Sequence, residues 1–223
     1  MLIVIDMQEK LVPHIDDGIW FAERVSILVR AADLLDVPIV FTEQNPRGLG
    51  SAIHGFIGAR HRLVEKETFD ATLEPAFLEA LPPKSSTVWI AGAEAHICVL
   101  MTALGLLRLG HRVEWIADAV ESRRVEDRSR ALERAVQEGV RVTTVETALF
   151  GWMGSFRHPR FRDVLGLTCR SIAIRPNPPS FSAASRLAFL RHQSIGVTRF
   201  RLLSKKQACL ARSLSLFRLS SPA

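Results

Sequence analysis

Residues 86–110, STVWIAGAEAHICVLMTALGLLRLG, guide the interpretation of the whole chain. A short apolar run rich in β-forming residues, Val88 to Ala91, stops at Gly92, and a segment with helical apolar spacing begins a few residues later. The pattern predicts a strand, a tight turn and a helix with Cys98 in its first turns. In such a unit the strand end and the helix start meet at the sheet edge where α/β proteins usually bind ligands.

Cys98 is the first candidate functional residue. Exposed N–H groups and the positive end of a helix dipole favour a thiolate over a thiol, so a cysteine at this place could be a nucleophile at neutral pH. The alternative is that Cys98 is a small buried apolar residue, because buried thiols are common. This stretch alone leaves both possibilities open.

Length and composition predict one α/β domain with a tail. The chain has 223 residues, and charges interrupt its apolar runs within the length of a helix, so we expect no membrane span. The start, MLIVIDMQ, reaches Asp6 after five residues without a basic leader, which predicts no signal peptide and a cytoplasmic location. The three cysteines show neither metal-ligand spacing nor a disulfide framework.

The positive charge of the chain is confined to its last quarter. The net charge is +6, but residues 169–223 hold ten Lys or Arg and no acid, which leaves 19 basic and 23 acidic residues in residues 1–168. We therefore expect a folded domain over residues 1–168 that does not bind nucleic acid. Residues 169–223 are expected to form a basic, Ser/Arg-rich tail that could make non-specific contacts with nucleic acid, with possible amphipathic helices at Leu187–Leu190 and Leu210–Leu219.

Strand and helix patterns alternate along residues 1–168. This alternation predicts an α/β fold with a doubly wound, mostly parallel sheet and helices on both of its faces. Residues 44–59 are Gly-rich and are expected to form a loop. Strands are expected at residues 2–5, 37–42, 62–64, 88–91, 112–117 and 140–145, and helices at residues 20–35, 74–81, after Cys98, 125–138 and 159–165.

Three polar side chains fall on the same rim of this predicted sheet. Asp6 ends the first strand, Lys66 follows the third, and Cys98 follows the fourth. Together they supply a nucleophile, a carboxylate that can take its proton and a cation that can hold both charges, a set suited to acyl transfer or amide hydrolysis without a metal.

Other polar residues near the strand ends are weaker candidates. His96 lies two residues before Cys98, and residues two apart on a helix do not face each other. His54 and His61 lack the neighbouring ligands that a metal site needs, so no metal is expected. Asp118 and Ser122 could contact substrate, but helix capping is the favoured interpretation.

Four segments together carry a resemblance to a known family. VIDMQEKL (residues 4–11), TEQNPRGLG (42–50), EKETFDA (65–71) and GAEAHICV (92–99) resemble the isochorismatase-like cysteine hydrolases, in particular the small isochorismatase-domain hydrolases of undefined substrate. The resemblance covers roughly residues 1–168 and is specific because four separate segments agree in order and separation.

The resemblance implies a mechanism and an assignment of site residues. It implies a three-layer fold, no cofactor, and a catalytic triad of Asp6, Lys66 and Cys98, in which Asp6 deprotonates Cys98, Lys66 orients Asp6, and a thioester is hydrolysed by water. It also implies a cis peptide bond between Ala93 and Glu94, and an oxyanion hole formed by the backbone N–H groups of Glu94 and Cys98.

The resemblance says less about the substrate pocket and about assembly. It implies a small-molecule substrate and a homo-oligomer, and it offers the aromatic residues Trp20, Phe21, Trp152 and Phe156 as candidate walls of the pocket, although such residues are more often core. The nicotinamidase branch of the family has a metal site that this sequence lacks, which disfavours nicotinamide as the substrate. Gln8 and Glu94 match characteristic positions without an assigned role.

A second hypothesis belongs to a different functional class. The chain could be a hydrolase-like oligomeric scaffold whose basic tail docks to an acidic partner. Residues 1–168 favour the enzyme, whereas the composition of residues 169–223 keeps the scaffold as an alternative.

Overall fold

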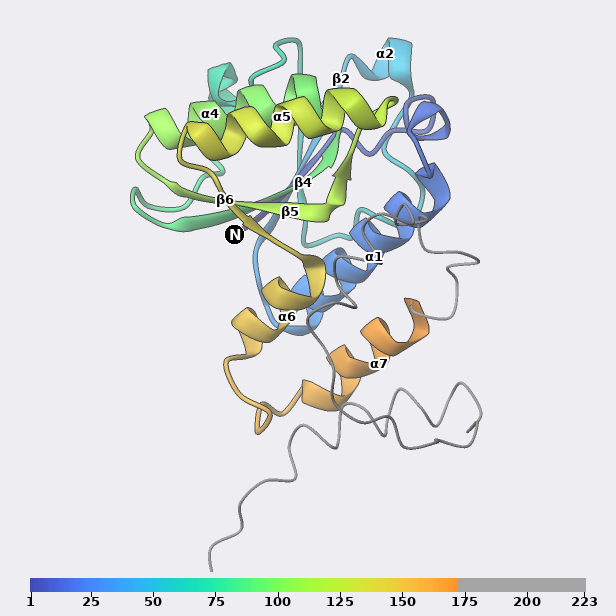
Figure 1. The fold of residues 1–223 in the computed structure, drawn as a ribbon, viewed down its shortest axis with the longest axis vertical. Coiled ribbons are helices and arrows are strands. Elements are labelled where there is room, and N and C mark those ends of the chain that lie inside the picture. Colours follow the sequence, from blue (N-terminus) through green and yellow to red (C-terminus); the bar gives the residue numbers. More distant parts are fainter. Residues whose placement is uncertain (172–223) are drawn as a thin grey trace, which may run out of the picture. The chain divides into compact units, whose positions relative to one another are not determined.

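The computed structural model describes residues 1–171, and their side chains through Thr168. Figure 1 shows its central sheet with helices on both faces. The sheet has the order β3-β2-β1-β4-β5-β6, and every paired neighbour is parallel. The strands are β1 (Leu2–Ile5), β2 (Ile39–Gln44), β3 (Arg62–Lys66), β4 (Thr87–Ala93), β5 (Arg112–Glu121) and β6 (Arg141–Thr143). The predicted doubly wound α/β fold is confirmed.

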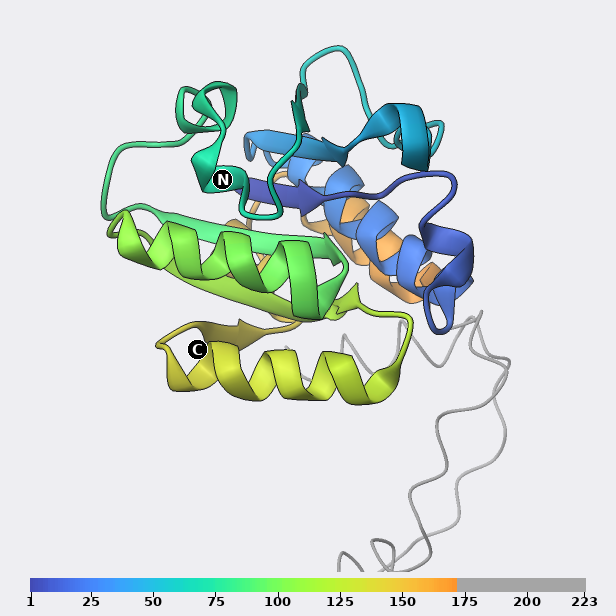
Figure 2. The same cartoon turned by 90° about the horizontal axis from the view of Figure 1, so that it is seen from above.

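The helices form the outer two layers. The α-helices are α1 (Gly18–Leu34), α2 (Pro46–Leu49), α3 (Pro75–Leu78), α4 (Leu100–Arg108), α5 (Val125–Gln137), α6 (Val145–Met153) and α7 (Phe161–Ser171). Figures 1 and 2 show α4 and α5 on one face of the sheet and α1 on the other. Shorter helical turns are η1 (Val12–His14), η2 (Ala71–Leu73) and η3 (Ala95–Val99). Among the described residues, no helix is long and apolar enough to cross a membrane.

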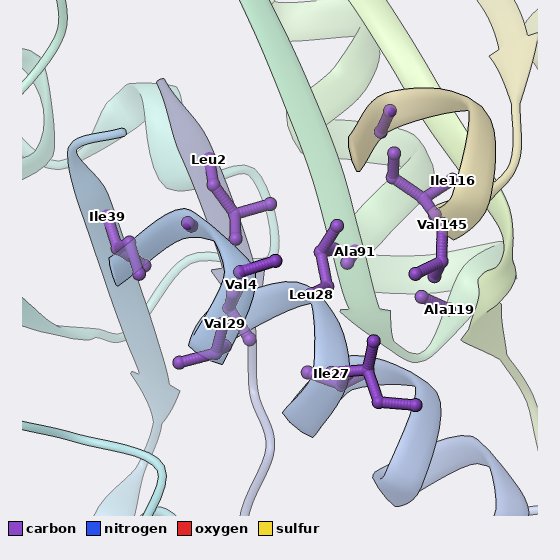
Figure 3. Close-up of a cluster of buried hydrophobic side chains, with 14 of the residues drawn as sticks. Leu2, Val4, Ile27, Leu28, Val29, Ile39, Ala91, Ile116, Ala119 and Val145 are labelled. Carbon is purple, nitrogen blue, oxygen red and sulfur yellow. The ribbon is translucent and has the colours of Figure 1, made fainter. Parts of the chain in front are cut away.

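The alternation of side chains along each strand divides the core into two clusters. On β1, Leu2 and Val4 belong to the cluster with α1, whereas Ile3 and Ile5 belong to the cluster with α4. Figure 3 shows the first cluster, in which side chains of β1, β2, β4 and β5 meet those of α1 and the start of α6. Because both faces of β1 are covered, the strand is apolar throughout, as is typical of a central parallel strand.

Gly92 allows β1 and β4 to approach each other closely. Its φ is +117°, and a Cβ at this position would lie 2.0 Å from the carbonyl oxygen of Ile5. The ladder between β4 and β5 is also irregular between Ile90 and Gly92. A side chain here would therefore disturb the end of strand β4, just before the chain reaches Cys98.

Some boundaries differ from the sequence prediction for identifiable reasons. Residues 46–49 form the short helix α2, which begins at Pro46 and is followed by Gly50 as its C-cap, within the segment expected to be a loop. Residue 145 begins α6 and does not continue a strand. Thr144 is the N-cap, and its hydroxyl accepts from Thr147 N at 3.3 Å, while the Asp118 carboxylate accepts from Val145 N at 2.7 Å. Asp118 thus caps a helix, as the sequence favoured, but the helix after β6 and not the one after its own strand.

What the sequence predicts for the last quarter of the chain is not tested by the structure. Contacts group Met1–Thr168 into one compact unit. The possible helices at Leu187–Leu190 and Leu210–Leu219 lie outside the described residues, and the division into a domain and a basic tail is not tested.

We expect the substitution Gly92→Ala to destabilise the protein by about 3 kcal/mol or more, because the new methyl group meets backbone atoms of β1 in addition to the cost of the positive φ. Gly110→Ala is the matched control, since Gly110 also has a positive φ (+87°) but a Cβ there would have nothing within 4 Å. It should cost about 1 kcal/mol. Urea unfolding of both variants tests this, and equal losses would contradict a specific role for the β1–β4 contact.

Candidate active site

The site lies where the winding of the sheet changes direction. β1 continues to β2 on one side, whereas its other neighbour, β4, leads on to β5. Asp6 directly follows β1. Cys98 lies in η3, which begins directly after the cis peptide bond between Ala93 and Glu94. In open parallel sheets, the crevice at such a switch point is where ligands bind.

Asp6 and Lys66 form a buried ion pair across this rim. The Lys66 ammonium Nζ lies 2.8 Å from Oδ2 of Asp6, and neither side chain is exposed to solvent. The contact does not have hydrogen-bond geometry, and Oδ2 accepts no hydrogen bond within the described part of the chain. Asp6 also has a φ of 49°, in the left-handed region that non-glycine residues rarely adopt outside turns and functional sites. Oδ2 is therefore a buried acceptor still able to take a proton.

Two polar side chains of β2 hold this ion pair in place. Thr42 Oγ1 donates to Oδ1 of Asp6 at 2.6 Å, and Lys66 Nζ donates to Oε1 of Gln44 at 2.6 Å. Gln44 pairs in register with Lys66 on the neighbouring strand, and β2, which carries Gln44, lies between β3 and β1. The sequence pattern gave neither residue a role, although both belong to the TEQ segment that carries part of the family resemblance.

Gln8 has a structural role at the same rim. Its Nε2 donates to the carbonyl oxygens of Gln44 at 3.1 Å and Gly50 at 2.6 Å, and its Oε1 accepts from Gln44 N at 2.9 Å. The buried amide thus joins the chain after β1 to the end of β2 and to the end of α2. These hydrogen bonds give Gln8, which the sequence left without a role, a structural one.

The Cys98 thiol is buried and interacts with both members of the ion pair. Burial and, to a smaller extent, the Asp6 carboxylate raise the pKa of Cys98 and the Lys66 ammonium lowers it, so that the pKa is raised to about 12 in all. The resting sulfur is therefore a neutral thiol. The expectation that the helix start favours a thiolate is not supported, because burial has the largest effect on this pKa and favours the neutral thiol. A nucleophilic Cys98 must pass its proton to a base as it reacts.

A cavity of about 470 Å³ opens onto Asp6 and Cys98. Its apolar walls come from Leu11, Leu49, Phe69 and Ile97, and Gln44 borders it as well. The remaining lining residues are polar or charged: Lys10, His14, Glu94 and Arg123. We call this space the Cys98 cavity. Its size suits a small molecule.

The four aromatic residues proposed from sequence do not line the Cys98 cavity. Phe21 is buried in the core cluster beneath α1, and Trp152 packs edge-on against Trp89. Trp20 stacks with the guanidinium of Arg24. The family analogy that offered them as walls did not identify the aromatic residue that lines the cavity, Phe69, which lies in the loop after β3.

Glu94 connects the turn before Cys98 to the loop after β5. The carboxylate is almost fully buried and lies 2.9 Å from Nε of Arg123 and 3.7 Å from Nδ1 of His96. His96 also contacts the buried Ser122 hydroxyl at 3.0 Å. His96 thus links the Glu94 carboxylate to the Ser122 hydroxyl. The Ala93–Glu94 peptide bond is cis, as the resemblance implied.

No group of three or more His, Cys, Asp or Glu that could hold a metal ion occurs among the described residues. The residues near Cys98 therefore do not fit the metal site of the nicotinamidase branch. The expectation of a metal-free and cofactor-free reaction remains a prediction.

The fold and this geometry define an α/β protein with a buried Asp–Lys–Cys group at a switch point. Comparison with known proteins then identifies the family: residues 1–147 match the family model "Isochorismatase domain". The chain belongs to the isochorismatase family. That membership supports a hydrolase-like function.

Relatives and solved structures agree with this assignment. The chain is 36% identical over 185 residues to isochorismatase domain-containing protein 2 of Xenopus laevis, covering 81% of this chain and 86% of that protein. It is 36% identical over 165 residues to isochorismatase domain-containing protein 1 of Salmo salar, covering 71% of this chain but only 57% of that protein. The structure of MAR1 ribonuclease from Caenorhabditis elegans matches with a TM-score of 0.70 and 28% identity, covering 89% of this chain and 95% of that one.

The charges around Cys98 give a testable shift of its pKa. Because the Asp6 carboxylate raises the pKa of Cys98, Asp6→Asn should lower it below about 12; because the Lys66 ammonium lowers it, Lys66→Met should raise it. The rate of Cys98 alkylation by iodoacetamide against pH, followed by peptide mass spectrometry, measures both. At a fixed pH near the ordinary thiol pKa of 9.0, Asp6→Asn should label faster and Lys66→Met more slowly than the wild type.

Both variants break a buried ion pair and should lose about 3–5 kcal/mol of stability, so labelling is measured below their melting temperatures. Cys98→Ala gives the background labelling of the other thiols. Shifts of the same sign in the two variants would contradict the electrostatic assignment.

Proposed function

We propose that this protein is a cofactor-free cysteine hydrolase that cleaves a C–N bond of a small amide-like substrate through a thioester on Cys98. One observation carries the proposal: a neutral thiol, an acceptor oxygen without a hydrogen-bond donor and a buried ammonium meet beside a cavity of small-molecule size. Family membership supports the hydrolase class of this proposal.

In the first step, Cys98 Sγ attacks the carbonyl carbon of the amide as its proton passes to Oδ2 of Asp6. Lys66 keeps the ion pair aligned and offsets the negative charge as it moves from Asp6 to sulfur. The C–N bond then breaks, and the leaving nitrogen takes the proton from Asp6. The products are a thioester and a free amine.

In the second step, water attacks the thioester carbonyl and gives its proton to Asp6. The C–S bond breaks, the carboxylic acid leaves, and the proton returns to sulfur. The neutral thiol with its raised pKa is regenerated, ready for the next cycle. The same carboxylate serves as base and acid in turn.

The oxyanion of each tetrahedral intermediate would be held by the backbone N–H groups of Glu94 and Cys98. Both residues border the Cys98 cavity, and both lie on the short segment from the end of β4 through η3. Preorganised N–H donors of this kind are typically worth 10²–10³-fold in rate.

We propose a homo-oligomer, as the family resemblance implies. The C. elegans protein with a similar structure is named a ribonuclease, so RNA belongs in the substrate panel beside small amides and ureides.

The scaffold remains the second candidate. It rests on the ten basic and no acidic residues of residues 169–223. It predicts binding of an acidic partner or polyanion that weakens steeply with salt and that is unaffected by Cys98→Ala. Binding insensitive to salt would count against it.

The decisive experiment compares wild type, Cys98→Ala and Cys209→Ala on the panel. Cys98→Ala should fold normally but lose about 10³-fold or more in turnover, because it removes the nucleophile. It should also fail to form a thioester adduct in acid-quenched mass spectra. Cys209→Ala controls for the loss of a thiol as such. Equal turnover by wild type and Cys98→Ala would overturn the proposal.

A further inference from the structure

Two carboxylates, Asp6 and Glu94, and two cations, Lys10 and Arg123, line the Cys98 cavity. The buried Lys66 ammonium, which contacts Asp6 from outside the lining, adds a third cation. Each of the two carboxylates already has a cation: Asp6 contacts Lys66, and Glu94 contacts Nε of Arg123. Lys10 is the additional cation of the lining. Its Nζ donates to the neutral carbonyl oxygen of Gly48 at 3.2 Å, and no carboxylate of the described chain lies within ion-pair distance of it.

Arg123 keeps unused donors beside the cavity. Only its Nε bonds to Glu94; the two terminal nitrogens donate no hydrogen bond within the described residues. The buried Glu94 carboxylate fixes the inner part of the guanidinium, while the side chain remains about half exposed. A planar guanidinium with free terminal N–H groups is suited to a carboxylate.

We propose that the Cys98 cavity is specific for substrates that carry a carboxylate away from the scissile amide, and that Arg123 is the main carboxylate-binding residue with Lys10 as the second. This inference rests on the proposed function and names its substrate class. A substrate with one carboxylate would balance the additional cation, and the apolar walls formed by Leu11, Phe69 and Ile97 would accommodate the rest of its body.

The other titratable groups around the cavity do not compete for this role. Lys66 does not line the cavity, and its ammonium already contacts Asp6 and donates a hydrogen bond to Gln44. His14 borders the cavity as well, but an imidazole lacks the planar fork of donors that a guanidinium offers to a carboxylate. The carboxylate is therefore expected near Arg123 or Lys10 and not at the base of the site.

Alkylation of Cys98 can test the inference before any substrate is known. The probes are N-bromoacetylglycine, which carries a carboxylate, and N-bromoacetylglycinamide, its neutral counterpart, together with the β-alanine homologues of both. In each case sulfur displaces bromide from the CH₂ group and the thiol proton is lost. The two probes react with the same sulfur, so the raised pKa of Cys98 cancels in the ratio of their rates.

In the full-length wild type, the acid-to-amide rate ratio should exceed the ratio measured with N-acetylcysteine. Arg123→Gln should lower it by about three- to tenfold, and Lys10→Gln by about twofold, while labelling by the neutral probes stays near the wild-type rate. The wild-type preference should also fall as salt is raised to about 0.5 M. Rates are measured by peptide mass spectrometry at Cys98.

Arg124→Gln and Lys84→Gln are the matched controls. They remove the same charges from residues that do not line the cavity, so the ratio should not change. Thermal melting confirms that each variant is folded, and Lys10→Gln keeps the test valid if Arg123→Gln destabilises the loop around Glu94.

Two failures can be told apart. If turnover survives in Cys98→Ala, the proposed function fails. If Cys98 reacts but the ratio equals that of N-acetylcysteine, or is unchanged in both Arg123→Gln and Lys10→Gln, the carboxylate specificity is overturned while the hydrolase stands.

Discussion

The buried ion pair between Asp6 and Lys66 is the interaction on which the site depends. Two unexposed charges are costly to desolvate, and such a pair is retained only where its remaining polar atoms are well bonded. Thr42 and Gln44 provide those bonds from β2, and Gln8 fixes the chain that follows β1. The order of β1, β2 and β3 in the sheet is thus directly linked to the chemistry at its rim.

The same rim depends on a close backbone contact. Gly92 brings β4 against Ile5 at the end of β1, and the chain then passes through the turn at Glu94 into η3. Asp6 and Cys98 are therefore placed by adjacent strands and not by flexible loops. Sites built on regular elements hold their geometry more accurately than sites built on loops.

Burial determines how the thiol can react. A thiolate at rest would be poorly solvated, so burial favours the neutral form of Cys98, and Oδ2 of Asp6 accepts no hydrogen bond within the described part of the chain. Two cations, Arg123 and Lys10, line the same cavity. Separate residues can thus act on the amide and on a distant carboxylate of one substrate.

The sequence by itself determined the parallel α/β fold, the rim shared by Asp6, Lys66 and Cys98, and, through the family resemblance, the cis peptide at Ala93–Glu94. These follow from local periodicity and from motifs that lie within single segments. Only the tertiary structure decided that the thiol is neutral, that Thr42 and Gln44 hold the ion pair, and that Phe69 and Arg123 line the cavity while Trp20 and Trp152 do not. Solvent exclusion and contacts between residues distant in sequence depend on how the strands assemble, and no single segment contains that information.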